Sequence, residues 1–180
     1  MSEEVRELAE HAEHAGNDPS LAPVTVTMAI MAVLVAAVGL LGHRAHTEEI
    51  LLQNKATDTW NEYQAKSIRR HGYEQFTDLL SISDFKNVEA AAKMKEKYSR
   101  EIERYKDDQD KLQAEARNLE DEVAGEGRKA NRFDLGEVCL EAALVIASMT
   151  LITRRRPFWY GGIALAVVGL GVAATGFLVH

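Results

Sequence analysis

The sequence predicts an all-α membrane protein with three transmembrane helices and a long antiparallel helical hairpin, of the coiled-coil type, between the first and the second. Three apolar stretches, 24–41, 135–152 and 158–179, each approach the roughly 20 helical residues that cross a hydrocarbon core. Residues 43–134, between the first two, contain 17 Lys or Arg and 20 Asp or Glu, which is too polar for lipid. The predicted segments are therefore 1–22, 23–42, 43–134, 135–153 and 158–179.

Residues 1–22 are an acidic N-terminal segment, predicted to be an amphipathic helix, in which Arg6 is the only basic residue. A cleavable signal peptide would have a positive region here, so the first apolar run is expected to remain as an anchor. Pro23 suits the first turn of a helix, where an N–H group would have no partner. The first transmembrane helix is therefore placed at 23–42.

The expected orientation follows from the short connection between the second and third apolar stretches, which contains Arg154, Arg155 and Arg156. Positive charge in a short loop favours the cytoplasm. This places the N-terminus in the cytoplasm and the hairpin in the periplasm or outside the cell. Basic residues that flank the hairpin favour the opposite orientation, but a long segment can translocate despite its charges.

A 3,4 spacing of mostly apolar residues in the second half of the hairpin predicts a coiled-coil seam. It comprises Val88, Ala91, Lys95, Tyr98, Ile102, Tyr105, Gln109, Leu112, Ala116, Leu119 and Val123. Gly125 and Gly127 are expected to end this helix, and Ser83 or Asp84 to cap its start. An antiparallel first arm, with the turn near 81–84, has a less regular pattern. Part of the seam is therefore expected to be buried against other copies in a homo-oligomer.

Small residues line one face of two of the predicted transmembrane helices, where they allow helices to approach closely. In the third helix these are Gly162, Ala166, Gly169, Ala173 and Gly176, and in the first they are Ala29, Ala32, Ala36 and Gly39. Packing within one chain and packing between chains both fit this pattern.

The second transmembrane helix contains an acidic stripe, because Asp134, Glu137, Glu141 and Ser148 fall on one face. Ionisable groups inside a membrane usually face a bundle interior or a water-filled path. Three alternatives are open: hydrated carboxylates near the interface, a ring that selects cations in an oligomeric pore, and a proton path.

Two histidines, His43 and His46, lie where the first helix leaves the membrane, and they are candidates for pH-sensitive groups. No nucleophile elbow, phosphate-binding glycine loop or dinucleotide fingerprint is present. The single cysteine, Cys139, cannot build a thiolate metal cluster, and no basic face suggests nucleic acid. The sequence therefore predicts neither an enzyme nor a cofactor nor a metal site.

Two blocks of the sequence resemble a known family. They are LGHRAHTEEILLQNKATDTWNEYQAKSIRRH at 41–71 and NRFDLGEVCLEAALVIASMTLITRRRPFWYGG at 131–162. Both are similar to the bacterial domain of unknown function 4337 family. The resemblance implies a multi-pass protein of the bacterial inner membrane and carries over no functional residue.

Together these patterns favour a non-enzymatic, self-associating membrane protein that acts as a scaffold or assembly factor through its hairpin. Its partners are expected to be the lipid bilayer, further copies of the chain and a protein that docks on the hairpin. The alternative is an oligomeric cation channel or a proton-coupled transporter that uses the acidic stripe.

Overall fold

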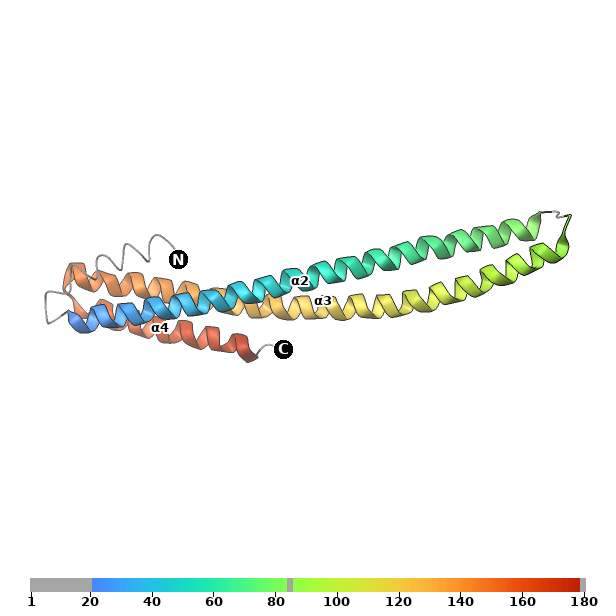
Figure 1. The fold of residues 1–180 in the computed structure, drawn as a ribbon. Coiled ribbons are helices and arrows are strands. Elements are labelled where there is room, and N and C mark those ends of the chain that lie inside the picture. The colour runs from blue at the N-terminus through green and yellow to red at the C-terminus, as the bar shows by residue number, and fades with distance from the viewer. Residues whose placement is uncertain (1–20, 84–85, 179–180) are drawn as a thin grey trace. The chain divides into compact units, whose positions relative to one another are not determined.

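The structure, a computed structural model, describes residues 21–83 and 86–178, and within them it is all-helical (Figure 1). Helix α2 runs Ala22–Ile82, α3 Val88–Thr153 and α4 Arg156–Thr175, and a 3-10 turn, η2, covers Gly176–Leu178. The predicted amphipathic helix at the N-terminus lies outside the described residues, apart from its last two positions. Each of the three long helices contains a segment long and apolar enough to span a membrane.

Helix α3 continues through Gly125 and Gly127, so the predicted helix end at these glycines is wrong. A glycine inside a helix costs roughly 1 kcal/mol relative to alanine, which the surrounding helical residues outweigh. At Gly127 the missing side chain also makes room for a neighbour, because a β-carbon there would lie 2.8 Å from Oε1 of Glu49.

The start of α3 is capped by Asn87, since its Oδ1 accepts a hydrogen bond of 3.0 Å from the backbone N–H of Ala90. An asparagine is among the best residues for this position. The predicted cap at Ser83 is wrong, because the Ser83 hydroxyl instead donates to the carbonyl of Leu79 within α2. Asp84 lies outside the described residues.

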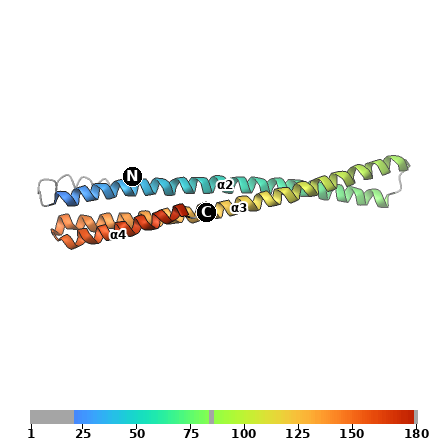
Figure 2. The same ribbon diagram turned by 90° about the horizontal axis from the view of Figure 1, so that it is seen from below.

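The chain divides into two compact units, to both of which α2 and α3 contribute. The first comprises 21–49 and 124–178, and the second comprises 50–123. In the first unit, parts of α2 and α3 lie beside α4 (Figures 1 and 2). Its apolar core is formed mainly by α2 and α3: Val24, Met28, Met31, Val35, Val38, Ala45, Ala130, Phe133, Leu140, Ala143, Leu144, Ala147, Ala166 and Ala173.

The 3,4 spacing predicted for α3 in the second unit also occurs in the first unit, without a change of phase. There it includes Glu126, Ala130, Phe133, Glu137, Leu140, Leu144, Ala147 and Leu151, none of which is exposed. In α2 the matching positions of the first unit are Val24, Met28, Met31, Val35, Val38, Gly42, Ala45 and Glu49, again none exposed. Both helices therefore use one heptad face in this unit.

Helices α3 and α4 pack through small residues on both sides. A β-carbon at Gly169 would lie 2.9 Å from the Gly136 carbonyl oxygen, and one at Gly162 would lie 2.8 Å from that of Ala143. At the end of the contact, a β-carbon at Gly176 would lie 3.1 Å from the ring of Phe133. The backbones thus approach more closely than any larger side chain would allow.

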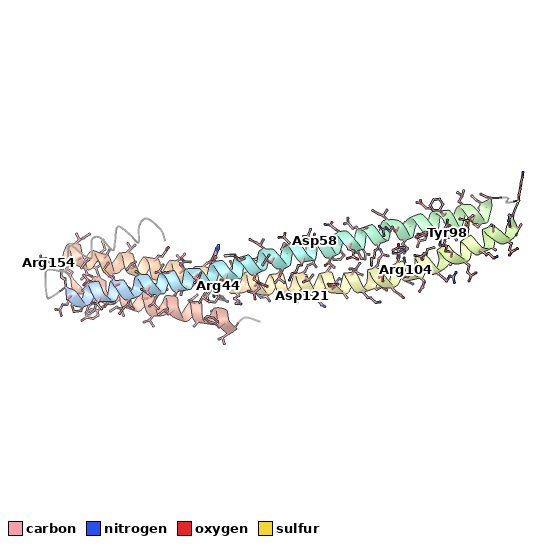
Figure 3. The ribbon with its side chains drawn as sticks, in the orientation of Figure 1. Arg44, Asp58, Tyr98, Arg104, Asp121 and Arg154 are labelled. Carbon is pink, nitrogen blue, oxygen red and sulfur yellow. The ribbon has the colours of Figure 1, made fainter. Side chains whose placement is uncertain are left out.

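In the second unit, the arms of α2 and α3 run side by side in opposite directions (Figure 1). The Trp60 indole Nε1 donates to Glu120 Oε1 at 2.8 Å, and Lys66 Nζ donates to Asp108 Oδ2 at 2.9 Å. This bond to Lys66 lowers the pKa of Asp108. Asp58 and Asp121, which have no such partner among the described residues, are exposed (Figure 3).

Candidate functional site: a histidine and carboxylate cluster between two helices

The most polar contact of the first unit centres on His46 of α2. Its Nε2 lies 2.9 Å from Asp134 Oδ2 on α3, and its Nδ1 lies 3.3 Å from Glu49 Oε2 one turn along α2. A doubly protonated imidazole would donate to both carboxylates at once. His46, Glu49 and Asp134 form what we call the His46 cluster, which joins α2 to α3 just outside the predicted membrane segments.

Glycines make room for the carboxylates around this cluster. A β-carbon at Gly42 would lie 2.9 Å from Asp134 Oδ1, and one at Gly39 would overlap the carboxyl of Glu137, with Cδ at 2.8 Å. Gly127 of α3 receives Glu49 from α2 in the same way. Two glycines of α2 and one of α3 therefore lie opposite acidic side chains of the other helix, and this lets carboxylates lie inside a close helix contact.

The charge of His46 depends on its carboxylate neighbours. Its hydrogen bond to Asp134 is the largest influence and raises the pKa of His46 above the ordinary 6.5, with Glu49 acting in the same direction. Burial acts in the opposite direction but is weaker than these bonds together. Because the folded pKa is raised, the cluster stabilises the fold fully below pH 6.5 and loses this contribution as the pH rises through the raised value.

We expect His46→Gln to lower the melting temperature more at pH 5.5 than at pH 8.5. The loss should stay within about 1 kcal/mol, because the imidazole is 44% exposed and solvent screens the pair. Thermal unfolding of the full chain across this pH range measures the effect. The control is His43→Gln, since His43 is exposed and its imidazole makes no hydrogen bond to a described residue. Equal pH dependence in both variants would contradict the assignment.

His46 was predicted as a pH-sensitive group and Asp134 as part of the acidic stripe, and the structure brings the two side chains into contact. Glu137 and Glu141 are partly buried and form no hydrogen bond or ion pair with any described residue. The hydroxyl of Ser148 donates to the carbonyl of Val145 in its own helix, at 2.7 Å. Among the described residues, no three His, Cys, Asp or Glu side chains are arranged to hold a metal ion.

The small-residue faces differ between the two helices that carry them. In the third apolar helix all of the predicted residues are buried: Gly162, Ala166, Gly169, Ala173 and Gly176. The atoms nearest to the three glycines among them belong to α3 of the same chain. In α2, Ala29 and Ala36 are exposed, whereas Ala32 and Gly39 are partly buried. Valine and methionine side chains fill the contact instead, since they lie on the neighbouring face of α2.

The predicted seam of α3 is covered unequally along its length. Tyr105 and Gln109 are buried, with 7% and 3% of their surface exposed, while Val88 is 75% exposed. Tyr98, Ile102, Leu112, Leu119 and Val123 are partly buried. Lys95, one of the two polar positions of the seam, is exposed, which suits a long charged side chain.

The sequence profile of one family, described as a domain of unknown function (DUF4337), matches residues 20–179. The chain belongs to the DUF4337 family. No curated protein and no solved structure matches it. The DUF4337 match spans the His46 cluster, the α3–α4 contact and both arms, so all of these features belong to the family domain of this chain.

Proposed function

We propose that this DUF4337 protein is a non-enzymatic integral membrane protein that self-associates through its paired arms and serves as a scaffold or assembly factor. The observation that carries this proposal is an exposed, uncharged heptad face on α2, described below. The membrane is proposed to be the bacterial inner membrane. The N-terminus and the Arg154–Arg156 loop would be cytoplasmic and the arms periplasmic.

The membrane part of the proposal is supported by apolar side chains that no other part of the described chain covers. Val26, Ile30, Val33 and Leu40 of α2 are each more than half exposed, as are Val167 and Val168 of α4. A soluble protein rarely leaves so large an apolar surface in water. Lipid tails would cover these side chains at no cost in free energy.

The inner faces of the arms support a coiled-coil pairing within one chain. In α2 the residues that face α3 follow a 4,3 spacing: Leu52, Ala56, Thr59, Tyr63, Lys66, Arg70, Tyr73, Thr77 and Leu80, none of them exposed. The rings of Tyr73 and Tyr98 lie 5.2 Å apart, and those of Tyr73 and Tyr105 lie 6.0 Å apart. Aromatic pairs at such distances stabilise a helix contact.

A second heptad face occupies the far side of α2 in the same arm. We call it the outer face, and it comprises Asn61, Ala65, Ile68, Gly72, Gln75, Leu79 and Ile82. It contains no charged residue, although charged residues flank it on both sides. Ile68 is 73% exposed, Leu79 53% and Ile82 82%. Apolar residues with heptad spacing normally pack against another helix.

The occupant that best fits the outer face is the outer face of a second copy. Without charges it neither selects nor repels a charged partner, and the amides of Asn61 and Gln75 can each donate and accept in a like-with-like pair. An open groove of about 420 Å³ borders this face, lined by Arg69, Gly72, Tyr73, Phe76 and Tyr105. Because Gly72 has no side chain, a leucine or isoleucine of the second copy could enter the groove.

We expect the double variant Ile68→Lys, Leu79→Lys to dissociate the assembly while it keeps its helix content. Two lysines at facing heptad positions place like charges in an apolar contact, at a cost of several kcal/mol, on the order of 3 or more. Light scattering of the full chain in detergent gives its size, and circular dichroism gives its helix content. Ser81→Lys is the control, since Ser81 is exposed and does not belong to the outer face. An unchanged size of the double variant would contradict the proposal, as would a monomeric wild type.

A second candidate function, a cation or proton path, is favoured by the unpaired carboxylates of Glu137 and Glu141. An unpaired carboxylate costs roughly 2.5 to 3.5 kcal/mol at the middle of a membrane helix and less toward the end, where Glu137 and Glu141 lie, so a carboxylate kept there suggests a use. In proteoliposomes, Glu141→Gln should reduce cation or proton flux while assembly survives. Glu115→Gln, an exposed change in the arm, is the control. Absence of flux in the wild type, with a more stable Glu141→Gln variant, would leave only the scaffold function.

A further inference from the structure

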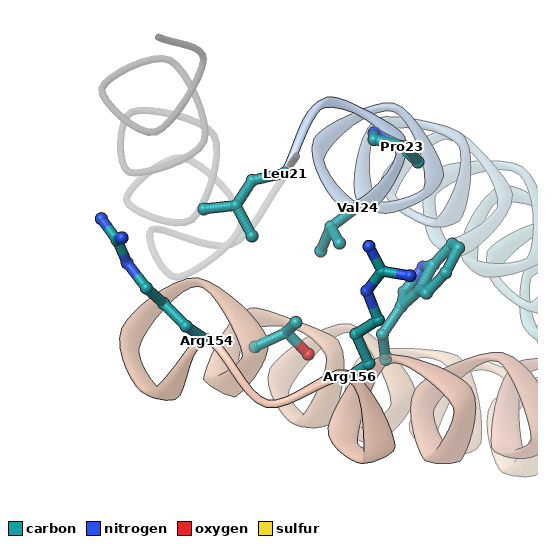
Figure 4. A pocket seen from close by; sticks show the side chains of 7 residues that line it. Leu21, Pro23, Val24, Arg154 and Arg156 are labelled. Atoms are coloured by element: carbon teal, nitrogen blue, oxygen red, sulfur yellow. The ribbon is translucent and has the colours of Figure 1, made fainter. Parts of the chain in front are cut away.

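A cavity of about 190 Å³ lies in the first unit, at the opposite end of its helices from the His46 cluster (Figure 4). It is formed by the first turn of α2, the last turn of α3 and the first turn of α4. Its lining residues are Leu21, Pro23, Val24, Thr150, Arg154, Arg156 and Trp159. None of these described lining residues is acidic, and their side chains are apolar, neutral and polar, or positively charged.

Two hydrogen-bond donors of this lining are buried without a partner. Thr150 is 1% exposed, and its hydroxyl Oγ1 makes no hydrogen bond. The indole Nε1 of Trp159 is buried and makes none either. Leaving a buried polar group unpaired costs roughly 1 to 3 kcal/mol, and such groups are few in native proteins. Two such donors on one cavity fit a ligand that has acceptor atoms.

Positive charge at the cavity indicates the sign of that ligand. Figure 4 shows the Arg156 side chain directed from the start of α4 toward the first turn of α2. Its guanidinium makes no hydrogen bond or ion pair with a described residue. The first turns of two helices, α2 and α4, also contribute to the lining, and a helix N-terminus favours an anion. The residue before α4, Arg155, provides no side-chain cap.

We propose that this cavity binds a phosphate group, held by the Arg156 guanidinium, the Thr150 hydroxyl and the Trp159 indole N–H. The planar guanidinium of arginine presents a fork of N–H donors that can bind two oxygens of a phosphate at once. The phosphate can come from the headgroup of an anionic phospholipid or from free phosphate. Trp159 and Tyr160 adjoin the site, and such aromatic residues gather at the headgroup level of membranes. The lipid source rests on the proposed membrane location, whereas the phosphate site does not.

The test uses the full chain with Trp60→Phe, which leaves Trp159 as its only tryptophan. Trp159 fluorescence is titrated in neutral detergent with phosphatidylglycerol, with phosphatidylcholine and with inorganic phosphate. We expect saturable binding of phosphatidylglycerol. Arg156→Gln and Thr150→Val should each weaken it about tenfold or more, as expected for one charge-assisted hydrogen bond. Arg155→Gln is the control, because it removes the same charge next to the site and does not line the cavity.

Saturation by inorganic phosphate, with the same sensitivity to Arg156→Gln, would support the site and assign it to free phosphate. Equal binding of phosphatidylcholine and phosphatidylglycerol, or equal affinity of the Arg156→Gln and Arg155→Gln variants, would overturn the proposal. Absence of binding by any probe would also overturn it. Light scattering on the same samples separates this outcome from self-association, because an oligomer without binding contradicts only the cavity.

Discussion

Gly169→Leu is expected to separate α4 from α3 and to cause a large loss of stability. A β-carbon at Gly169 would lie 2.9 Å from both the Gly136 carbonyl oxygen and Cβ of Cys139, and 3.2 Å from the backbone N of Leu140. Backbone atoms cannot move aside as a flexible side chain can, so the helices must part. The cost should be on the order of 3 kcal/mol or more.

The control for this experiment is Gly171→Leu, two residues along the same helix. Gly171 is exposed, and nothing lies within 4 Å of the β-carbon that a substitution would add. Both variants gain the same helix propensity and the same apolar volume, so only their contacts differ. Thermal unfolding of the full chain in detergent should show a large loss for Gly169→Leu and almost none for Gly171→Leu. Similar melting temperatures would mean that the α3–α4 contact does not hold the helices together.

The helical fold could be predicted because the sequence contains long periodic segments without ambiguous short ones. The extent of the α3 heptad face could not. In the first unit apolar residues occupy every side of the helix, exposed Val138 and Val145 as well as buried Leu140 and Leu144, so the spacing is hidden. Gly125 and Gly127 also resembled a helix end, and only the position of Glu49 beside Gly127 gives a physical reason for a glycine there.

The His46 cluster could be predicted only in part. The sequence distinguished both His46 and Asp134, because each is an ionisable residue at the edge of an apolar run. Their contact joins residues 88 positions apart, so it depends on the register between α2 and α3. A turn near 81–84 restricts this register without fixing it. The glycines opposite the carboxylates, Gly42 and Gly39, were a usable signal, since each lies on a heptad face or next to one.

The small-residue patterns looked alike in sequence but have different surroundings in the structure. On α4 they meet a glycine, Gly136, in the matching register of α3. On α2 the small residues have larger neighbours in the sequence, among them Met31 and Val35. These larger residues, and not the small ones, belong to the buried core. A small residue can bring two backbones together only where the opposite helix is also narrow. Spacing on one helix alone therefore could not distinguish the two cases.

Ala116→Asp is expected to open the paired arms of the second unit. Ala116 is fully buried, with 0% of its surface exposed, at a heptad position between α3 and α2. A carboxylate there would be desolvated without a cation beside it, and it would lie one turn from Glu120, which already accepts from Trp60. The cost should be on the order of 3 kcal/mol or more, from the buried charge and the lost packing.

Ala114→Asp is the matched control, because Ala114 is exposed two residues away on the same helix and loses the same helix propensity. Circular dichroism should show a much lower melting temperature for Ala116→Asp, and limited proteolysis should cut its arms within 50–123 first. The membrane-length segments should stay protected, since they belong to the other compact unit and keep their own core. If Ala116→Asp and Ala114→Asp have the same melting temperature, the heptad face of α3 does not stabilise the arms. The proposed self-association through the paired arms then loses its support.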